Sequence, residues 1–563
     1  MATIKVQAPP AVSLTLGDQV WIDRNFNGTF DPGIDLAPNG VTVNLYQDDG
    51  DGMLDAGDGA PIATTVTMNI GGQDGRYEFA GLAAGEYIVE VVTSSGPLTG
   101  ATSIVGATDP DNDVDGDDNG APVFGFEVAS AAITLSAGGE TLGNEDGDGD
   151  PDTNRTLDFG FDQPITINGN TASVLGTSGD DLIRYDLSAG RVTVNSSTFQ
   201  LPGNVTNVQF DGGPGNDQFI LVGTSGAEGV RLLPGVAFLD SSSVGVTGTA
   251  VSMETILYRG GGGADRPIFI DSTGNDTFIS RPMRATMQGP GYLNIAEDVV
   301  LVQAVASRGG ADQARLFDTL GDDTFTAQPG AASMLGNGLD VRTYSFEHVV
   351  GMASTGHDRA RLFGGPGADT LIGRPAVSVL ASATQLSEAN FFDVVTVRGG
   401  SAGDTARLFG DSGREVLAAA QDSVVFSSSI SNIFTAAFTR HIADGGGGND
   451  LARLFGSSFD DTFSASSAAS QLTSSGGHDL QVVNFAQVVS HALGGTGDLA
   501  ILTDSIGDDS FLADGTRGDM IGSGYLIQVN GFDTVRIRGV SGGINRRVVN
   551  NIAFMLIEQG TWI

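Results

Sequence analysis

Oxygen ligands at alternating positions are the side chains in this sequence best suited to chemistry, and that chemistry is the binding of a hard cation. In the segment DRNFNGTFDPGID, acids and asparagines occupy loop positions one, three, five and nine, and Gly28 takes position six, where the chain must turn sharply. Ile34 lies at position twelve, where a bidentate acid is usual, so Asp35 reaches the ion only through a bulge. The predicted calcium ligands of this first loop are Asp23, Asn25, Asn27, Asp31 and Asp35.

Two further loops repeat this alternation of ligands. The second loop, with Gln47 in the first place and Gly52 at the turn, offers Asp49, Asp51, Asp55 and Asp58. The third loop offers Asp111, Asp113, Asp115 and Asp117. A fourth acidic run, residues 146–152, lacks glycine at the required place. Loops rich in Asp and Gly also occur as solvated turns, but three loops in one register favour calcium sites.

The charge balance agrees with cation binding and excludes several partners. The chain has 68 acidic and 27 basic residues, a net charge of −41, and its acids are concentrated in residues 1–165. A chain this acidic repels nucleic acid and anionic membranes. It has no cysteine, which excludes disulfides and thiolate metal sites.

No set of residues predicts catalysis. The five histidines are scattered, and neither a metalloprotease, a serine hydrolase nor a phosphate-binding motif is present. We therefore expect a protein that is not an enzyme. A β-helical polysaccharide lyase or hydrolase is the enzymatic alternative, but its site would interrupt a repeat, whereas the repeats at 312–465 keep interchangeable corners.

Short strands must position the acidic loops. Alternating apolar and polar residues at 41–46, 76–79 and 86–92, separated by Gly and Asp turns, predict a β-sandwich over residues 14–164, after a tail at 1–13. The segments LGDQVWIDRNFNGTFDPG, GVTVNLY, GRYEFAGLAAGEYIVEV and TLDFGF resemble the B domains of serine-aspartate-repeat adhesins, which are related to the collagen-adhesin B fold.

The resemblance implies an immunoglobulin-like, calcium-binding sandwich that acts as a stiff spacer on a bacterial cell surface. It also implies that calcium is held by Asp23, Asn25, Asn27 and Asp31, at a site weakened by Ile34. The start MATIKVQAPP shows no signal peptide, and no apolar run is long enough to cross a membrane.

Residues 165–563 are repetitive. The tetrapeptide ARLF begins at Ala314, Ala360, Ala406 and Ala452, which are 46 residues apart, and weaker copies extend the series to seven or eight units. An Asp precedes each copy, at 217, 265, 312, 358, 404, 450 and 498. This period predicts a β-solenoid, a parallel β-helix with two coils of about 23 residues per unit. A seven- or eight-bladed β-propeller is the alternative.

The turns of these repeats favour the β-helix. GGPGNDQFI at 212–220 and GGPGADTLI at 364–372 resemble the calcium-binding turns of toxin-type (RTX-like) repeats, although the paired Asp residues here are too widely spaced for a continuous calcium ladder. The resemblance implies further calcium ligands at Asp217 and Asp369, and the alternative is Gly-Asp corners capped by backbone hydrogen bonds. The repeated arginines of ARLF could form a ligand-binding stripe, or an ion-pair ladder.

We therefore expect an all-β, secreted, calcium-stabilised cell-surface protein, with an adhesive or structural role and Ca²⁺ as its cofactor. Its expected partners are a second copy of itself, or an extracellular matrix or polysaccharide ligand. A self-assembling surface-layer or fibre subunit is the second non-enzymatic alternative.

Overall fold

The computed structural model describes residues 12–24, 27–98, 101–104, 109–111, 114–139, 149–177, 179–195, 197–401 and 403–563. Within these residues the regular structure consists of strands and one short 3-10 helix, η1 (Gly96–Leu98), which confirms the all-β prediction. No helix in this part of the chain is long and apolar enough to cross a membrane. The chain divides into two compact units, residues 1–222 with 244–254 and residues 223–243 with 255–563.

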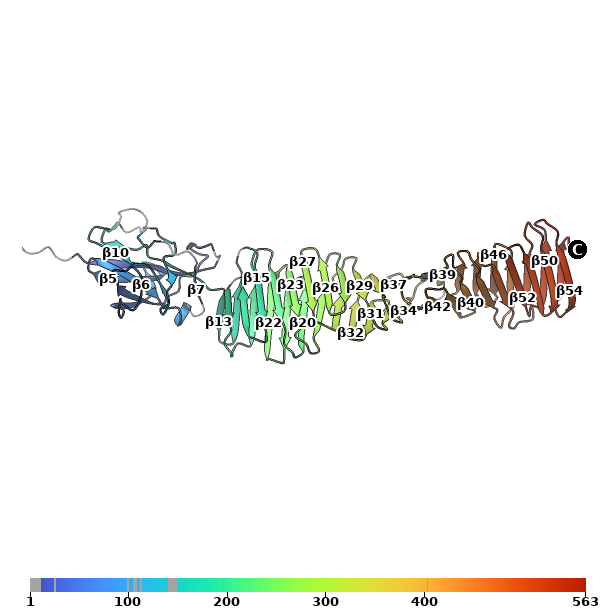
Figure 1. Cartoon of the computed structure of the whole chain (residues 1–563), viewed down its shortest axis with the longest axis horizontal. Coiled ribbons are helices and arrows are strands. Elements are labelled where there is room, and N and C mark those ends of the chain that lie inside the picture. Colours follow the sequence, from blue (N-terminus) through green and yellow to red (C-terminus); the bar gives the residue numbers. More distant parts are fainter. Residues whose placement is uncertain are drawn as a thin grey trace, which may run out of the picture. The chain divides into compact units, whose positions relative to one another are not determined.

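The first twelve strands form the predicted sandwich of two sheets (Figure 1). Side chains from both sheets, among them Leu16, Val20, Val43 and Val89, fill one core between them. One sheet contains β4 (Met68–Ile70), β5 (Gln73–Leu82), β1 (Leu14–Asp23), β12 (Phe159–Asp162) and β7 (Thr102–Ser103), with β11 (Thr153–Asn154) beside β1. The other contains β3 (Ala63–Val66), β2 (Thr42–Gln47), β6 (Gly85–Val91), β9 (Val128–Ala129) and β8 (Ala121–Pro122), with β10 (Ile133–Leu135) beside β6.

From β13 (Ile165–Asn168) onward the strands belong to two long sheets, of 22 and 21 strands, in the arrangement of a β-solenoid. We call them solenoid sheet 1, which contains β13 and β14 (Thr171–Leu175), and solenoid sheet 2, which contains β15 (Leu182–Asp186). Eight repeats of five strands each cover residues 171–211, 218–259, 266–305, 313–352, 359–398, 405–444, 451–491 and 499–539. The terminal strands are β54 (Arg546–Ile552) and β55 (Met555–Gly560). The solenoid prediction is confirmed, and the propeller alternative is wrong because the sheets are continuous.

Each repeat places three consecutive strands in one sheet and its first and last strands in the other. In the repeat at 313–352, β30 (Thr324–Gln328), β31 (Ala331–Gly336) and β32 (Leu339–Tyr344) form an antiparallel ladder in sheet 1. In the same repeat, β29 (Gln313–Phe317) and β33 (His348–Met352) pair in parallel in sheet 2.

The next repeat exchanges the sheets. Its first and last strands, β34 (Arg359–Phe363) and β38 (Val394–Arg398), pair in sheet 1. Its ladder of β35 (Thr370–Arg374), β36 (Val377–Ala381) and β37 (Leu386–Asn390) lies in sheet 2. Successive repeats alternate in this way because the chain crosses between the two sheets three times per repeat, which is an odd number.

This alternation corrects two expectations. Paired strands are one turn apart, and that turn takes 35 residues from Gln313 to His348, because it includes a three-stranded ladder. The predicted coil of about 23 residues is therefore wrong. The arginines of ARLF also do not form one stripe, since Arg315 and Arg407 lie in sheet 2 whereas Arg361 and Arg453 lie in sheet 1.

The ARLF strand alternates as its sequence predicts. In β34 the side chains of Ala360 and Leu362 are buried, whereas those of Arg361 and Phe363 face outward. In two of the repeats the outward phenylalanine is covered by an arginine of a neighbouring strand. The Arg281 guanidinium lies 4.4 Å from the ring centroid of Phe317, and that of Arg374 lies 5.1 Å from Phe409. Such cation–π contacts stabilise an exposed ring by about 0.5–1 kcal/mol.

Candidate metal centre

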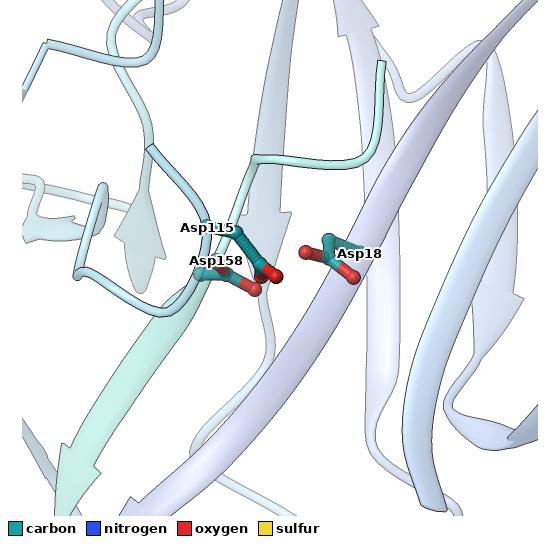
Figure 2. Close-up of side chains that lie close together, drawn as sticks. All are labelled: Asp18, Asp115 and Asp158. Carbon is teal, nitrogen blue, oxygen red and sulfur yellow. The ribbon is translucent and has the colours of Figure 1, made fainter. Parts of the chain in front are cut away.

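Three aspartates from distant parts of the sandwich sequence meet at one point. Asp18 lies in the middle of β1, Asp158 directly precedes β12, and Asp115 belongs to the loop between β7 and β8. One carboxylate oxygen from each lies within 4.8 Å of the other two. Figure 2 shows the three carboxylates turned toward one another. Of the three, only Asp115 was predicted as a ligand.

The position of β1 explains why this cluster is buried. β1 is hydrogen-bonded to β5 on one side and to β11 and β12 on the other, so it is a central strand with hardly any exposed residue. Asp18 and Asp158 are each only 1% exposed. The carboxylate of Asp158 accepts the backbone N–H groups of Gln19 (3.1 Å) and Gly116 (2.6 Å), which fix its orientation.

The cluster has more negative charge than its surroundings neutralise. Arg76 forms an ion pair with Asp18, but within the described residues no hydrogen-bond donor reaches the second oxygen of Asp18. Burial raises the pKa of Asp158 well above its usual value, and the charge of Asp115 raises it further. Partial desolvation, with the charge of Asp117, also raises the pKa of Asp115, although that residue is exposed. Three carboxylates and one guanidinium leave two negative charges, and a divalent cation with oxygen ligands would balance them.

Two further acids, the buried Asp118 and the half-buried Asp162, lie near the same strands. The pKa of Asp118 is raised to about 7, chiefly by burial, although its carboxylate accepts the backbone N–H groups of Gly120 and Gly160. Asp162, at the end of β12, has a pKa raised to about 6 by burial and by the charge of Asp23. The sequence motifs did not predict either residue as part of a site.

The first predicted loop is closed by its own hydrogen bonds. Asp23 accepts the N–H of Gly28 at 2.7 Å, and the side-chain amide of Asn27 donates to Asp31 at 2.6 Å. Asp35 accepts the backbone N–H groups of Arg24 (2.8 Å) and Asp31 (2.6 Å), so it joins the two ends of the loop. Asn25 lies outside the described residues. Calcium binding by this loop stays a prediction.

In the second loop the structure brings together Asp48, Asp49 and Asp51, with one carboxylate oxygen of each within 4.8 Å of the others. Asp48 thus adds an acid that the predicted ligand set did not contain, and calcium binding by this loop stays a prediction. Asp58 accepts the backbone N–H groups of Asp49 and Asp55, at 3.0 and 2.8 Å. Partial desolvation, and then the charges of its four acidic neighbours, raise the pKa of Asp49.

The third loop is divided. Asp115 joins Asp18 and Asp158, whereas Asp111 accepts the N–H of Thr134 at 3.2 Å, and Asp113 lies outside the described residues. Asp117 belongs to none of the three-acid clusters found among the described residues. In the fourth acidic run, the described residues Asp150 and Asp152 cap turns: Asp150 accepts the N–H of Asp152, and Asp152 that of Gly138.

In the solenoid, buried acids at the corners accept backbone N–H groups from the neighbouring turn. Asp358 accepts the N–H of Asp323 at 2.9 Å, and Asp393 accepts that of Asp358 at 2.8 Å. The same bond recurs between five other pairs of aspartates in the described residues: Asp181 and Asp217, Asp276 and Asp312, Asp369 and Asp404, Asp461 and Asp498, and Asp498 and Asp533. We call these acids the corner ladder.

The two solenoid residues predicted to bind calcium belong to this ladder. Asp217 accepts the N–H of Asp181 at 2.8 Å, and Asp369 accepts that of Gly365 at 2.8 Å. Neither takes part in a three-acid cluster within the described residues. Both thus act as corner caps, and calcium at these positions stays a prediction.

One corner does gather three buried acids, Asp318, Asp323 and Asp358. Burial raises the pKa of Asp358 to about 6, and its acidic neighbours contribute. Here, however, each carboxylate has donors. Asp318 accepts the N–H and hydroxyl of Ser354, Asp323 those of Thr319, and Asp358 the N–H of Asp323.

Comparisons with known proteins agree with the sandwich. The family model of the SdrD B-like domain matches residues 14–139. Over 214 residues the chain is 29% identical to serine-aspartate repeat-containing protein D of Staphylococcus aureus strain Newman. This aligned stretch covers 36% of this chain and 15% of that protein. Over 120 residues it is 32% identical to colossin-A of Dictyostelium discoideum. This stretch covers 21% of this chain and 1% of that protein. The chain thus spans a small part of these relatives, and residues 14–139 are similar to an SdrD B-like domain.

Proposed function

We propose that this chain is part of an extracellular, calcium-stabilised surface protein without enzymatic activity, in which the sandwich is a spacer and the solenoid an adhesive scaffold. The observation that carries the calcium proposal is the cluster of Asp18, Asp115 and Asp158. Two of its members are buried, it has a net charge of −2 with Arg76 included, and it lies beside a central strand. The resemblance to serine-aspartate-repeat proteins supports the surface location.

In this proposal calcium stabilises the sandwich by joining three separate segments. Asp18 lies on β1, Asp158 adjoins β12, and Asp115 lies in a loop about 40 residues before Asp158. An ion held by all three would cross-link the loop to two neighbouring strands and remove the repulsion between the carboxylates. Because the folded state alone assembles these ligands, binding would raise the free energy of unfolding in proportion to the logarithm of the calcium concentration.

A tryptophan probe tests the proposal in the full chain. Trp21 is fully buried in β1, and the only other tryptophan is Trp562 at the end of the solenoid, so the variant Trp562→Phe reports on the sandwich alone. At a calcium concentration of about 100 times Kd we expect about 2.7 kcal/mol of stabilisation, and hence a rise of about 5–10 °C in the Tm reported by Trp21.

The control is magnesium at the same concentration, since its smaller ion demands a stricter octahedral geometry and is expected to raise the Tm less. An unchanged Trp21 transition in millimolar calcium, relative to chelator, would contradict the calcium proposal. The spacer role of the sandwich would then depend on its packing alone.

A further inference from the structure

The outer face of solenoid sheet 1 is basic, although the chain as a whole is strongly acidic. On seven strands, β24 (Arg266–Ile270), β28 (Leu301–Val305), β30, β31, β32, β34 and β38, the outward charged residues are five arginines and one aspartate. The arginines are Arg266, Arg342, Arg359, Arg361 and Arg398, and the aspartate is Asp340. This basic face therefore has a net charge of about +4 in a chain whose total is −41.

Most of these arginines have no acidic partner. Arg342 forms a bidentate pair with Asp340, at 2.9 and 3.0 Å, whereas no ion pair joins the other four to an acid in the described residues. Solenoid sheet 2 is mixed, because acids pair with some of its outward arginines, whereas Arg315 and Arg407 have no ion pair with an acid in the described residues. Glu297 pairs there with Arg259 (3.3 Å) and Arg284 (3.1 Å), and Asp479 pairs with Arg440 (3.3 Å). Charge on sheet 1 is thus available to an external ligand.

A groove of about 270 Å³ lies on the same face. Pro267 and Val302 form its apolar floor, and Arg266, Gln303, Arg342 and Tyr344 are among the residues that line it. The strands fix this arrangement, since Gln303 on β28 is paired with Arg342 on β32 and with Ile268 on β24. Arg266 lies two strands away from Arg342 and is displaced by two residues along the strand direction, a backbone separation of about 12 Å.

We propose that the basic face of sheet 1 binds an acidic polysaccharide, with the groove holding one of its sugar residues. Guanidinium groups bind anionic groups through paired hydrogen bonds, Gln303 and the Asp340–Arg342 pair can bind hydroxyls, and the ring of Tyr344 offers an apolar surface to a sugar. Farther along the face, Phe363 lies among Arg359, Arg361 and Arg398 in a similar combination.

An extended ligand fits this face better than a compact one. From β24 to β38 the arginines span six strand spacings, about 29 Å, and the sheet between them has no other charged side chain except Asp340. Nucleic acid fits less well, because a duplex has about one charge per 1.7 Å, whereas the five arginines of this face are spread over about 29 Å. This ligand class rests on the proposed adhesive role of the solenoid. It does not depend on calcium binding by the sandwich.

The test uses the full chain in affinity electrophoresis, with chelator present so that calcium cannot bridge acids of the protein and the polymer. Gels contain polygalacturonate, dextran sulfate or neutral dextran, and a parallel assay uses duplex DNA. We expect retardation by polygalacturonate that weakens with added salt, and none by dextran. Retardation by dextran sulfate would show that the face accepts sulfate as well as carboxylate, which agrees with an acidic polysaccharide.

Matched variants locate the binding face. Replacement of Arg266 and Arg361 by Gln is expected to weaken the binding of polygalacturonate about tenfold. The control replaces Arg315 and Arg407, which occupy the Arg361 position of ARLF on the opposite sheet, and is expected to leave binding unchanged. Equal loss in both variants, no retardation by either acidic polymer, or tighter binding of DNA would overturn the inference. The calcium proposal is tested separately, by thermal melts of the sandwich. Loss of polysaccharide binding and loss of calcium stabilisation are therefore distinguishable.

Discussion

Buried aspartates occur in both the sandwich and the solenoid, but their surroundings differ in the supply of donors. In the sandwich, Asp18 has an ion pair with Arg76 and, within the described residues, no N–H or O–H donor on its second oxygen. In the solenoid, Asp318, Asp323 and Asp358 are equally crowded, and one oxygen of Asp323 also has no donor within the described residues, yet each of the three acids accepts at least one backbone N–H. Acid and glycine content alone therefore does not identify a cation site, because the same residues also cap turns.

The largest expected effect comes from removing one ligand of the sandwich cluster. Within the described residues no backbone N–H donates to Asp115, which is exposed, so Asp115→Asn removes a charge without leaving a buried donor unpaired. We expect the calcium-induced rise of about 5–10 °C in the Trp21 transition to disappear, while the Tm in chelator stays the same or rises slightly. The matched solenoid variant, Asp358→Asn, is expected to leave the calcium response intact. If Asp115→Asn kept the full response, calcium would bind elsewhere in the sandwich.

A second, smaller effect distinguishes a corner cap from a metal ligand. Asp358→Ala removes the acceptor of the buried Asp323 N–H, and we expect the solenoid to lose about 1–3 kcal/mol in its free energy of unfolding. Asp358→Asn keeps an acceptor oxygen and relieves repulsion within the cluster, so a change below about 1 kcal/mol is expected. Urea denaturation followed by circular dichroism measures both. A calcium-dependent solenoid transition that Asp358→Asn abolishes would show that this corner binds calcium as well.

The smallest effect is the dependence of stability on pH without calcium. The pKa values of Asp118 and Asp162 in the sandwich are raised to about 7 and 6, and those of Asp358 and Glu415 in the solenoid to about 6 and 7, in each case first by burial. An acid whose pKa is raised in the folded state stabilises the fold below its unfolded pKa, near 4, and this stabilisation is lost as the pH rises through 6–7.

We therefore expect the Tm of both regions to fall by several degrees between pH 4 and pH 8 in chelator. Calcium should restore only the sandwich transition, and its apparent affinity should weaken toward pH 5, where protons compete for the carboxylates. Differential scanning calorimetry at a series of pH values measures both transitions. Recovery of both regions in calcium would remove the distinction between them.

The sequence predicted part of the candidate site. It identified Asp115 from the alternation of acids in its loop, but Asp18 and Asp158 are isolated in their strand segments and have no such pattern. Both lie within motifs that carried the family resemblance, LGDQVW and TLDFGF. An acid between Leu157 and Phe159 was the signal that could have revealed Asp158, whereas Asp18 lies between Gly17 and Gln19 and has no such signal. In the second loop the prediction placed Gln47 first and omitted Asp48, which the fold brings beside Asp49 and Asp51 directly after β2.

By itself the sequence determined the all-β class, the two regions and the period of 46, because alternation and repetition are local properties of a chain. Only the tertiary structure decided the length of a solenoid turn and the side on which each ARLF arginine lies. Those features follow from a five-strand repeat that changes sheet at every copy. It also decided which acids meet, since the pairing of β1 with β12 brings together residues that are 140 positions apart in the chain. Hydrogen-bond donors reach some buried carboxylates and not others only once those strands are packed.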